Sequence, residues 1–177
     1  MGVRAVAAGD RGTRVAARRR MAAGELAVWR ALVETTAELR RMLGAQLLQE
    51  TGLSPADYQV LLALTEAEDA RLRSSKLAAT IDWERSRLSH HLSRMERRGL
   101  IRRDDCRTDS RGAEVSLTED GARMFRGATV PHTRAIKQHF ADALTPEQFE
   151  SLAGILRGLR NHLHPEPTAA RAGGGRP

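Results

Sequence analysis

Residues 86–101 read SRLSHHLSRMERRGLI and contain the pattern on which the fold depends. Leu88, Leu92 and Met95 recur at helical spacing, so they predict a buried stripe on a helix from about Glu84 to Arg98. The opposite side of this helix carries hydroxyls, an imidazole and guanidinium groups, and no acid. Its candidate contact residues are Ser86, Arg87, Ser89, His90, Ser93 and Arg94, with Arg97 beside them.

The residue types on this outer side suit a helix that lies in the major groove of DNA. Arginine pairs with guanine there, and serine or histidine bonds to base edges or phosphates. The alternative is a solvated basic surface with no partner, which the lack of acids on that side disfavours.

The residues around this helix extend the pattern to a winged helix-turn-helix. Before it, Ser74 or Ser75 is expected to cap a short helix that buries Leu77, Ala78 and Ile81, followed by a turn at Asp82-Trp83. After it, Gly99 is a left-handed cap, and the segments 100–103 and 113–117 are two short strands of a hairpin. The loop between them bears Arg107 and Arg111, which are placed to reach a minor groove.

Further helices flank this unit and make the expected fold mainly α with a small β-hairpin wing. An apolar stripe marks a helix over about 24–50, formed by Leu32, Leu39, Leu43 and Leu47. Gly52 breaks the chain, and Ser54-Pro55-Ala56-Asp57 then begins a mostly buried helix. Thr118 caps a long helix that Pro131 is expected to kink or interrupt, and Thr145-Pro146-Glu147-Gln148 is a capping box for the last helix.

Charge is distributed unevenly along the 177 residues. Residues 71–112 hold twelve Lys and Arg against six Asp and Glu, whereas residues 21–70 hold three against eight. A basic block of this kind is typical of a surface that binds phosphate, so we expect double-stranded DNA as the partner.

Other classes of protein find little support in the sequence. It contains no phosphate-binding glycine loop, no paired catalytic carboxylates and no nucleophile elbow, so we expect neither an enzyme nor a cofactor. No Cys and His cluster has metal-ligand spacing, so no metal site is expected. The sequence has a single cysteine, Cys106, which indicates a reducing compartment such as the cytoplasm. It has no long apolar run, so we expect no membrane-spanning segment.

The two ends of the chain differ in composition from its centre. Residues 1–20 contain six Arg and one Asp and are expected to be a disordered basic arm. Either Met21 is the true start, or the arm adds nonspecific affinity for DNA. The folded domain is expected over residues 21–163, with the winged helix-turn-helix at about 54–118 and a disordered tail at 164–177.

Four motifs in order resemble the MarR family, the multiple antibiotic resistance regulators. They are KLAA at 76–79, residues 86–101 as quoted above, DSR at 109–111 and LTEDG at 117–121. The resemblance covers about residues 25–163. It implies a dimeric transcriptional regulator that binds a pseudo-palindromic operator. The regulator is expected to be a repressor that responds to a small molecule. A constitutive or architectural DNA binder is the nearest alternative.

The resemblance also assigns roles to individual residues. Asp109 orients Arg111, which probes the minor groove. The terminal helices, at about 24–50 and 119–163, form the dimer interface, with candidates Leu32, Phe140, Leu144, Phe149, Leu152 and Leu156. Trp29 and Tyr58 are candidates to line a pocket for a small aromatic or acidic ligand, although ordinary core or dimer packing is the favoured alternative.

Overall fold

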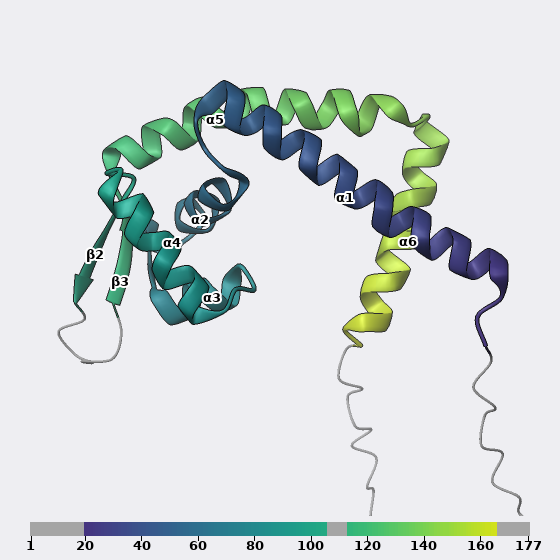
Figure 1. The fold of residues 1–177 in the computed structure, drawn as a ribbon, viewed down its shortest axis with the longest axis horizontal. Helices are drawn as coiled ribbons and strands as arrows, with labels where there is room; N and C mark the ends of the chain where they lie inside the picture. Colours follow the sequence, from purple (N-terminus) through teal and green to yellow (C-terminus); the bar gives the residue numbers. More distant parts are fainter. Residues whose placement is uncertain (1–19, 106–112, 166–177) are drawn as a thin grey trace, which may run out of the picture. The chain divides into compact units, whose positions relative to one another are not determined.

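The computed structural model describes residues 20–105 and 113–165. Six α-helices lie in these segments: α1 (Ala23–Thr51), α2 (Pro55–Thr65), α3 (Ser74–Thr80), α4 (Arg85–Arg97), α5 (Glu119–His139) and α6 (Pro146–Leu163). They are joined by three strands, β1 (Arg71–Arg73), β2 (Ile101–Asp105) and β3 (Ala113–Leu117), and by two short 3-10 turns, η1 (Glu68–Ala70) and η2 (Ala141–Ala143). The fold is mainly helical with a small antiparallel sheet, as the sequence predicts (Figure 1).

The chain divides into two compact units at a point within α1, between Ala37 and Glu38. The first contains the amino-terminal part of α1. The second contains the rest of α1 and every other helix and strand described above.

The core of the second unit lies beneath α4. Leu88, Leu92 and Met95 are at most 1% exposed, which confirms the stripe predicted from their spacing. They belong to one cluster with leucines of α2 and α3 and with Val115 of β3. Burial of such a stripe contributes about 1.5–3 kcal/mol per large apolar side chain and fixes which side of α4 faces outward.

Local signals in the sequence set the helix starts. Ser54 accepts a hydrogen bond from the backbone of Asp57, and the Asp57 carboxylate accepts one from the backbone of Ser54, so α2 begins with a complete capping box. Thr145 and Gln148 form the same arrangement at α6. Gly52 and Gly99 have φ of 71° and 73°, the left-handed conformation that glycine adopts without steric cost.

Three expectations from the sequence need correction. Ser74 does not cap α3: the cap residue is Arg73, and the Ser74 hydroxyl donates to the carbonyl of Ala113 in β3 instead. A tertiary partner therefore takes the hydroxyl that a local cap would use, and Ser75 lies inside the helix. The hairpin gains a third strand, because β1 pairs with β3 and gives the order β1-β3-β2.

Pro131 does not interrupt α5, which is continuous from Glu119 to His139. Proline removes one backbone donor from the helix. Ala128 and Ala135 are buried on either side of it, so tertiary packing supports the helix on both sides of the proline.

Candidate nucleic-acid interface

The outer side of α4 is an exposed surface without acids. Ser86, Arg87, Ser89, His90 and Arg94 are exposed, and Ser93 is half-buried because its hydroxyl donates to the carbonyl of Ser89. Among the described residues, the side chains of Ser86, Ser89 and His90 have no hydrogen-bond or ion-pair partner. Their polar groups are therefore free to bond to another molecule.

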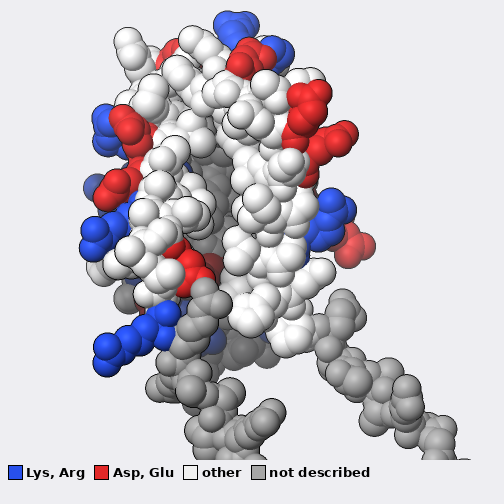
Figure 2. All heavy atoms as spheres, turned by 90° about the vertical axis from the view of Figure 1, so that its right-hand side faces the viewer, with Lys and Arg blue, Asp and Glu red and all other residues white. Residues whose placement is uncertain are grey.

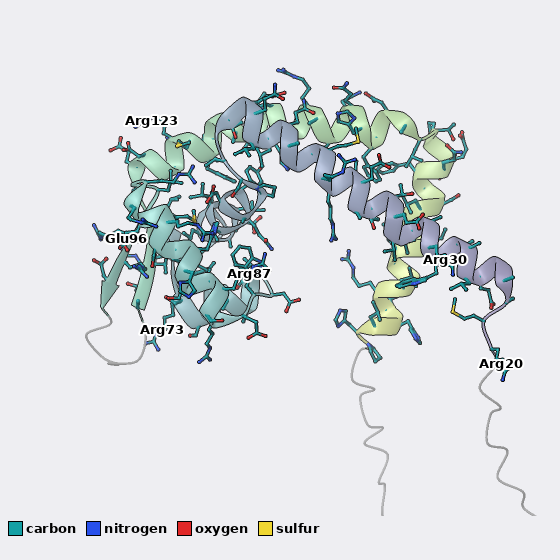
Figure 3. All side chains as sticks on the ribbon, in the orientation of Figure 1. Arg20, Arg30, Arg73, Arg87, Glu96 and Arg123 are labelled. Carbon is teal, nitrogen blue, oxygen red and sulfur yellow. The ribbon has the colours of Figure 1, made fainter. Side chains whose placement is uncertain are left out.

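Arg87 lies against an aromatic ring at the start of α4. Its guanidinium carbon is 4.2 Å from the centre of the Trp83 ring, a distance typical of a cation–π contact. Trp83 is half-buried and meets the His91 ring edge-on, with 5.3 Å between ring centres. The contact restricts Arg87, on the first turn of α4 (Figure 3), so that less conformational entropy is lost when it binds a partner.

A buried carboxylate joins α4 to the start of α2. Asp57 is 3% exposed, and Arg98 Nη1 lies 2.7 Å from its Oδ2 while Arg98 Nη2 donates to the carbonyl of Gly52. His91 Nε2 lies 3.1 Å from Asp57 Oδ1, although the approach departs from the direction of an ideal hydrogen bond. Burial alone would raise the pKa of Asp57, but the bonds from His91, Arg98 and Ser54 lower it well below its ordinary range, so the carboxylate stays ionised.

A second histidine contact reaches the outer side of α4. Arg94 Nη2 lies 2.8 Å from His91 Nδ1, one turn along the helix. A cavity of about 390 Å³ borders these groups, lined by Ser54, Ala56, Trp83, Arg87, His90, His91 and Arg94. Two guanidiniums and two imidazoles thus converge beside the amino terminus of α2.

The base of the wing is tied to the other end of α4. Arg103 in β2 forms an ion pair with Glu96 at 2.6 Å, and its backbone N–H also donates to the Glu96 carboxylate (Figure 3 labels Glu96). The Arg103 side chain holds the pKa of Glu96 below its usual range. The two strands therefore leave α4 in a fixed direction. The wing residues Arg107, Asp109 and Arg111, and also Cys106, lie outside the described residues.

The comparisons with known proteins agree with this geometry. The model of the MarR family matches residues 51–112. The solved structure of Sco3205 from Streptomyces coelicolor, a MarR-family transcriptional regulator in complex with DNA, is 38% identical with a TM-score of 0.74, over 87% of this chain and 96% of that one. AbsC, a MarR-family regulator of the same organism, is 36% identical with a TM-score of 0.73, over 84% of this chain and 99% of that one.

The chain belongs to the MarR family. It is a DNA-binding transcriptional regulator with a winged-helix fold, in which α4 occupies the place of the recognition helix. A further MarR-like structure is the organohalide-sensing regulator RdhR-CbdbA1625 bound to 2,4-dichlorophenol. It is 26% identical with a TM-score of 0.68, over 78% of this chain and 80% of that one.

The two residues suggested for a ligand pocket of this MarR-family chain lie in different units. Trp29 is 54% exposed and belongs to the first unit. Tyr58 packs against Phe125 and His132 of α5, with ring centres 5.0 and 4.8 Å away. Burial lowers the pKa of His132, which favours a neutral imidazole beside Tyr58. No sequence signal had brought His132 to Tyr58.

The residues suggested for the MarR-family dimer interface remain accessible in the single chain. Leu32 is 41% exposed in the first unit; in the second, Phe149 is 44% and Leu156 45% exposed, while Phe140, Leu144 and Leu152 are half-buried. Phe140 and Phe149 contact each other, with 5.8 Å between ring centres. In the view of Figure 2, uncharged side chains, drawn in white, cover much of the surface of the described residues.

Sequence reasoning missed three functional neighbours of the recognition helix in this MarR-family chain. Trp83 was interpreted only as a turn residue, and no role was predicted for His91. Arg98 carried no signal for its pairing with Asp57, which is 41 positions away.

None of the described helices is both long and apolar enough to cross a membrane, and no three His, Cys, Asp or Glu side chains in the described segments gather to hold a metal ion.

Proposed function

We propose that this regulator binds a pseudo-palindromic operator as a homodimer, with one recognition helix in each of two successive major grooves. The observation that carries the proposal is the acid-free outer side of α4, held rigidly by three buried residues beneath it. The basic block at residues 71–112 supports it, as does the DNA complex of Sco3205. Half-sites of a two-fold dimer lie about 34–36 Å apart, so both helices must be correctly spaced for tight binding.

The recognition helix supplies the major-groove contacts in this proposal, from Ser86, Arg87, Ser89, His90, Ser93 and Arg94. Arg87 is the best candidate to read a base, because the Trp83 ring already orients it. Arg107 and Arg111, with Asp109 as the orienting acid, supply the minor-groove contacts from the wing.

The dimer uses the exposed apolar residues of the terminal helices. Leu32, Phe140, Leu144, Phe149, Leu152 and Leu156 are the interface residues proposed here, and all of them retain accessible surface in the single chain. Exposed apolar side chains on α6, among them Ile155 at 59% and Leu163 at 70%, add to this surface. Exposed apolar side chains of this kind mark a protein contact, and a second copy of the chain covers them in this proposal.

A small aromatic or acidic effector acts on this dimer in the proposal, and Tyr58, which packs against Phe125 and His132, is its candidate contact. The support is the 2,4-dichlorophenol bound to RdhR-CbdbA1625, which is such a molecule. An effector that favours a dimer with misplaced recognition helices lowers operator affinity, because it binds that state more tightly. The regulator is thus proposed to be a repressor that leaves its operator when the effector binds. In this proposal residues 21–163 form the folded domain, between the basic arm at 1–20 and the tail at 164–177. The protein acts in the cytoplasm.

The test is fluorescence anisotropy with duplexes from the region upstream of the gene, at several salt concentrations. We expect one duplex to bind at least about 10³-fold more tightly than a scrambled duplex of the same length. Equal affinities would contradict a regulator and support an architectural DNA binder.

Light scattering should give the mass of a dimer, and Leu156→Arg should give a monomer with lower operator affinity. A panel of chlorinated phenols and aromatic acids then tests release from the operator.

A further inference from the structure

The contact between Arg94 and His91 determines which nitrogen of the imidazole carries the proton. Arg94 Nη2 lies 2.8 Å from His91 Nδ1, which is hydrogen-bond distance. A guanidinium has donors and no acceptor, so Nδ1 must be the acceptor and cannot carry a hydrogen. The single proton of a neutral imidazole then lies on Nε2, the nitrogen that faces the Asp57 carboxylate at 3.1 Å.

The surroundings of His91 act on this proton from three sides. The Asp57 carboxylate of α2 lies 3.1 Å from Nε2 and is itself held ionised by Arg98 and by the backbone of Ser54. Trp83 covers the ring edge-on and carries the Arg87 guanidinium on its own face. Arg94 donates at Nδ1 from the same helix, and His90, the next residue, faces outward. His91 itself is 6% exposed, so water has little access to it.

We infer that His91 is a positioning residue of the recognition helix, which holds the Arg94 guanidinium in place by accepting its hydrogen bond as the neutral Nε2–H tautomer. The inference rests on the proposed function, in which Arg94 contacts DNA. Asp57 selects the tautomer, so the buried end of α2 controls the direction of a side chain on the outer side of α4.

Protonation of the imidazole reverses the contact. A doubly protonated ring has an N–H at Nδ1 directed at a guanidinium, and neither group can accept. Two positive groups at that distance repel each other, so Arg94 leaves its position.

The first test observes the tautomer directly. Long-range ¹H–¹⁵N NMR spectra of the full chain at pH 8 distinguish a protonated from an unprotonated ring nitrogen, and H91Q identifies the His91 signals by their loss. We expect an unprotonated Nδ1 and a protonated Nε2, and R94A should weaken the bias toward this tautomer. A proton on Nδ1 at pH 8 would overturn the inference, whatever the protein does with DNA.

The second test uses variants that separate shape from charge. Glutamine can accept from Arg94 with its carbonyl and donate to Asp57 with its amide, yet it does not titrate. We expect H91Q to keep most of the ratio between operator and scrambled-duplex affinity at pH 8, and H91L to lower it about tenfold, the size of one lost specific contact. An H91L protein with the wild-type ratio would contradict the positioning role.

R94A separates the positioning role of His91 from the DNA contact proposed for Arg94. If R94A leaves the ratio unchanged at pH 8, the DNA contact proposed for Arg94 is wrong, and the NMR result decides separately whether His91 holds it.

Discussion

Arg98 and Asp57 are 41 positions apart in sequence, yet Nη1 of the arginine lies 2.7 Å from Oδ2 of the carboxylate. The pair joins the carboxyl end of the recognition helix to the amino end of α2, where Asp57 also completes the capping box with Ser54. Through His91, the same carboxylate reaches the middle of the recognition helix. One buried acid therefore fixes both a helix start and the placement of the DNA-reading helix.

Asp57→Ala is expected to destabilise the fold strongly. The substitution removes the carboxylate half of the capping box, while the Ser54 cap remains, and leaves Arg98 without its charged acceptor. Loss of the bond from the Ser54 backbone costs about 0.5–1.5 kcal/mol, and loss of a charged acceptor about 1.5–3 kcal/mol more. Arg98→Ala should cost less, because the arginine side chain is 42% exposed and water screens its charge. Urea denaturation of both variants measures the difference, with the exposed Arg97→Ala as a matched control near wild type. A larger loss in Arg98→Ala would contradict this ranking.

Acid should weaken the fold through the same carboxylate. The folded state lowers the pKa of Asp57 below the ordinary value of 3.8, so the unfolded chain binds a proton more readily than the folded one. The stability that this group contributes is complete above its unfolded pKa and is lost as pH falls through its folded pKa. We expect the free energy of unfolding to decrease below about pH 4, and Asp57→Asn to show a shallower decrease there. Denaturant titrations between pH 2 and 7 measure both slopes; equal slopes would assign the acid sensitivity to other carboxylates.

The parts of this fold that the sequence predicts are those with short-range causes. Leu88, Leu92 and Met95 lie on one helix face, so their spacing alone identifies the buried side of the recognition helix. Capping residues act within four positions, which is why the starts of both α2 and α6 were predicted, the latter with its complete capping box.

The features that the sequence does not predict have long-range causes. The Ser74 hydroxyl bonds to Ala113, 39 positions away, and a local cap rule cannot foresee such a partner. Strand β1 has a single apolar residue, Leu72, between two arginines, so its pairing with β3 leaves no alternating pattern. Residue spacing likewise gave no reason to place the Trp83 ring beneath Arg87, because the contact depends on how the turn before the helix folds.

Arg87→Ala is expected to weaken operator binding more than binding to scrambled DNA. An arginine that reads guanine contributes about 1–3 kcal/mol of discrimination, whereas a phosphate contact mainly changes the salt dependence. Trp83→Leu should produce a smaller loss in the same direction, since Arg87 remains but loses its ring support. Anisotropy titrations at several salt concentrations separate these effects, with Arg123→Ala on α5 as a control that keeps the wild-type preference (Figure 3). Equal losses on both duplexes would refute a base-reading role for Arg87.

Gly121→Ala is expected to disturb the connection between the wing and α5. A Cβ at this position would lie 2.0 Å from the carbonyl oxygen of Leu100, a distance that no packing adjustment of a side chain relieves, because the obstacle is backbone. The first turn of α5 must therefore move away from the start of β2, at a cost of about 1–3 kcal/mol.

Gly127→Ala is the matched control, because it lies in the same helix with open space around the added methyl group. There alanine should stabilise the helix by about 0.5–1 kcal/mol, since glycine loses more backbone entropy on folding. Thermal unfolding should therefore shift in opposite directions for the two variants. If Gly121→Ala had the same melting temperature as Gly127→Ala, the close approach of α5 to Leu100 would not be required. The wing and α5 would then be joined less rigidly than the contact between Gly121 and Leu100 implies.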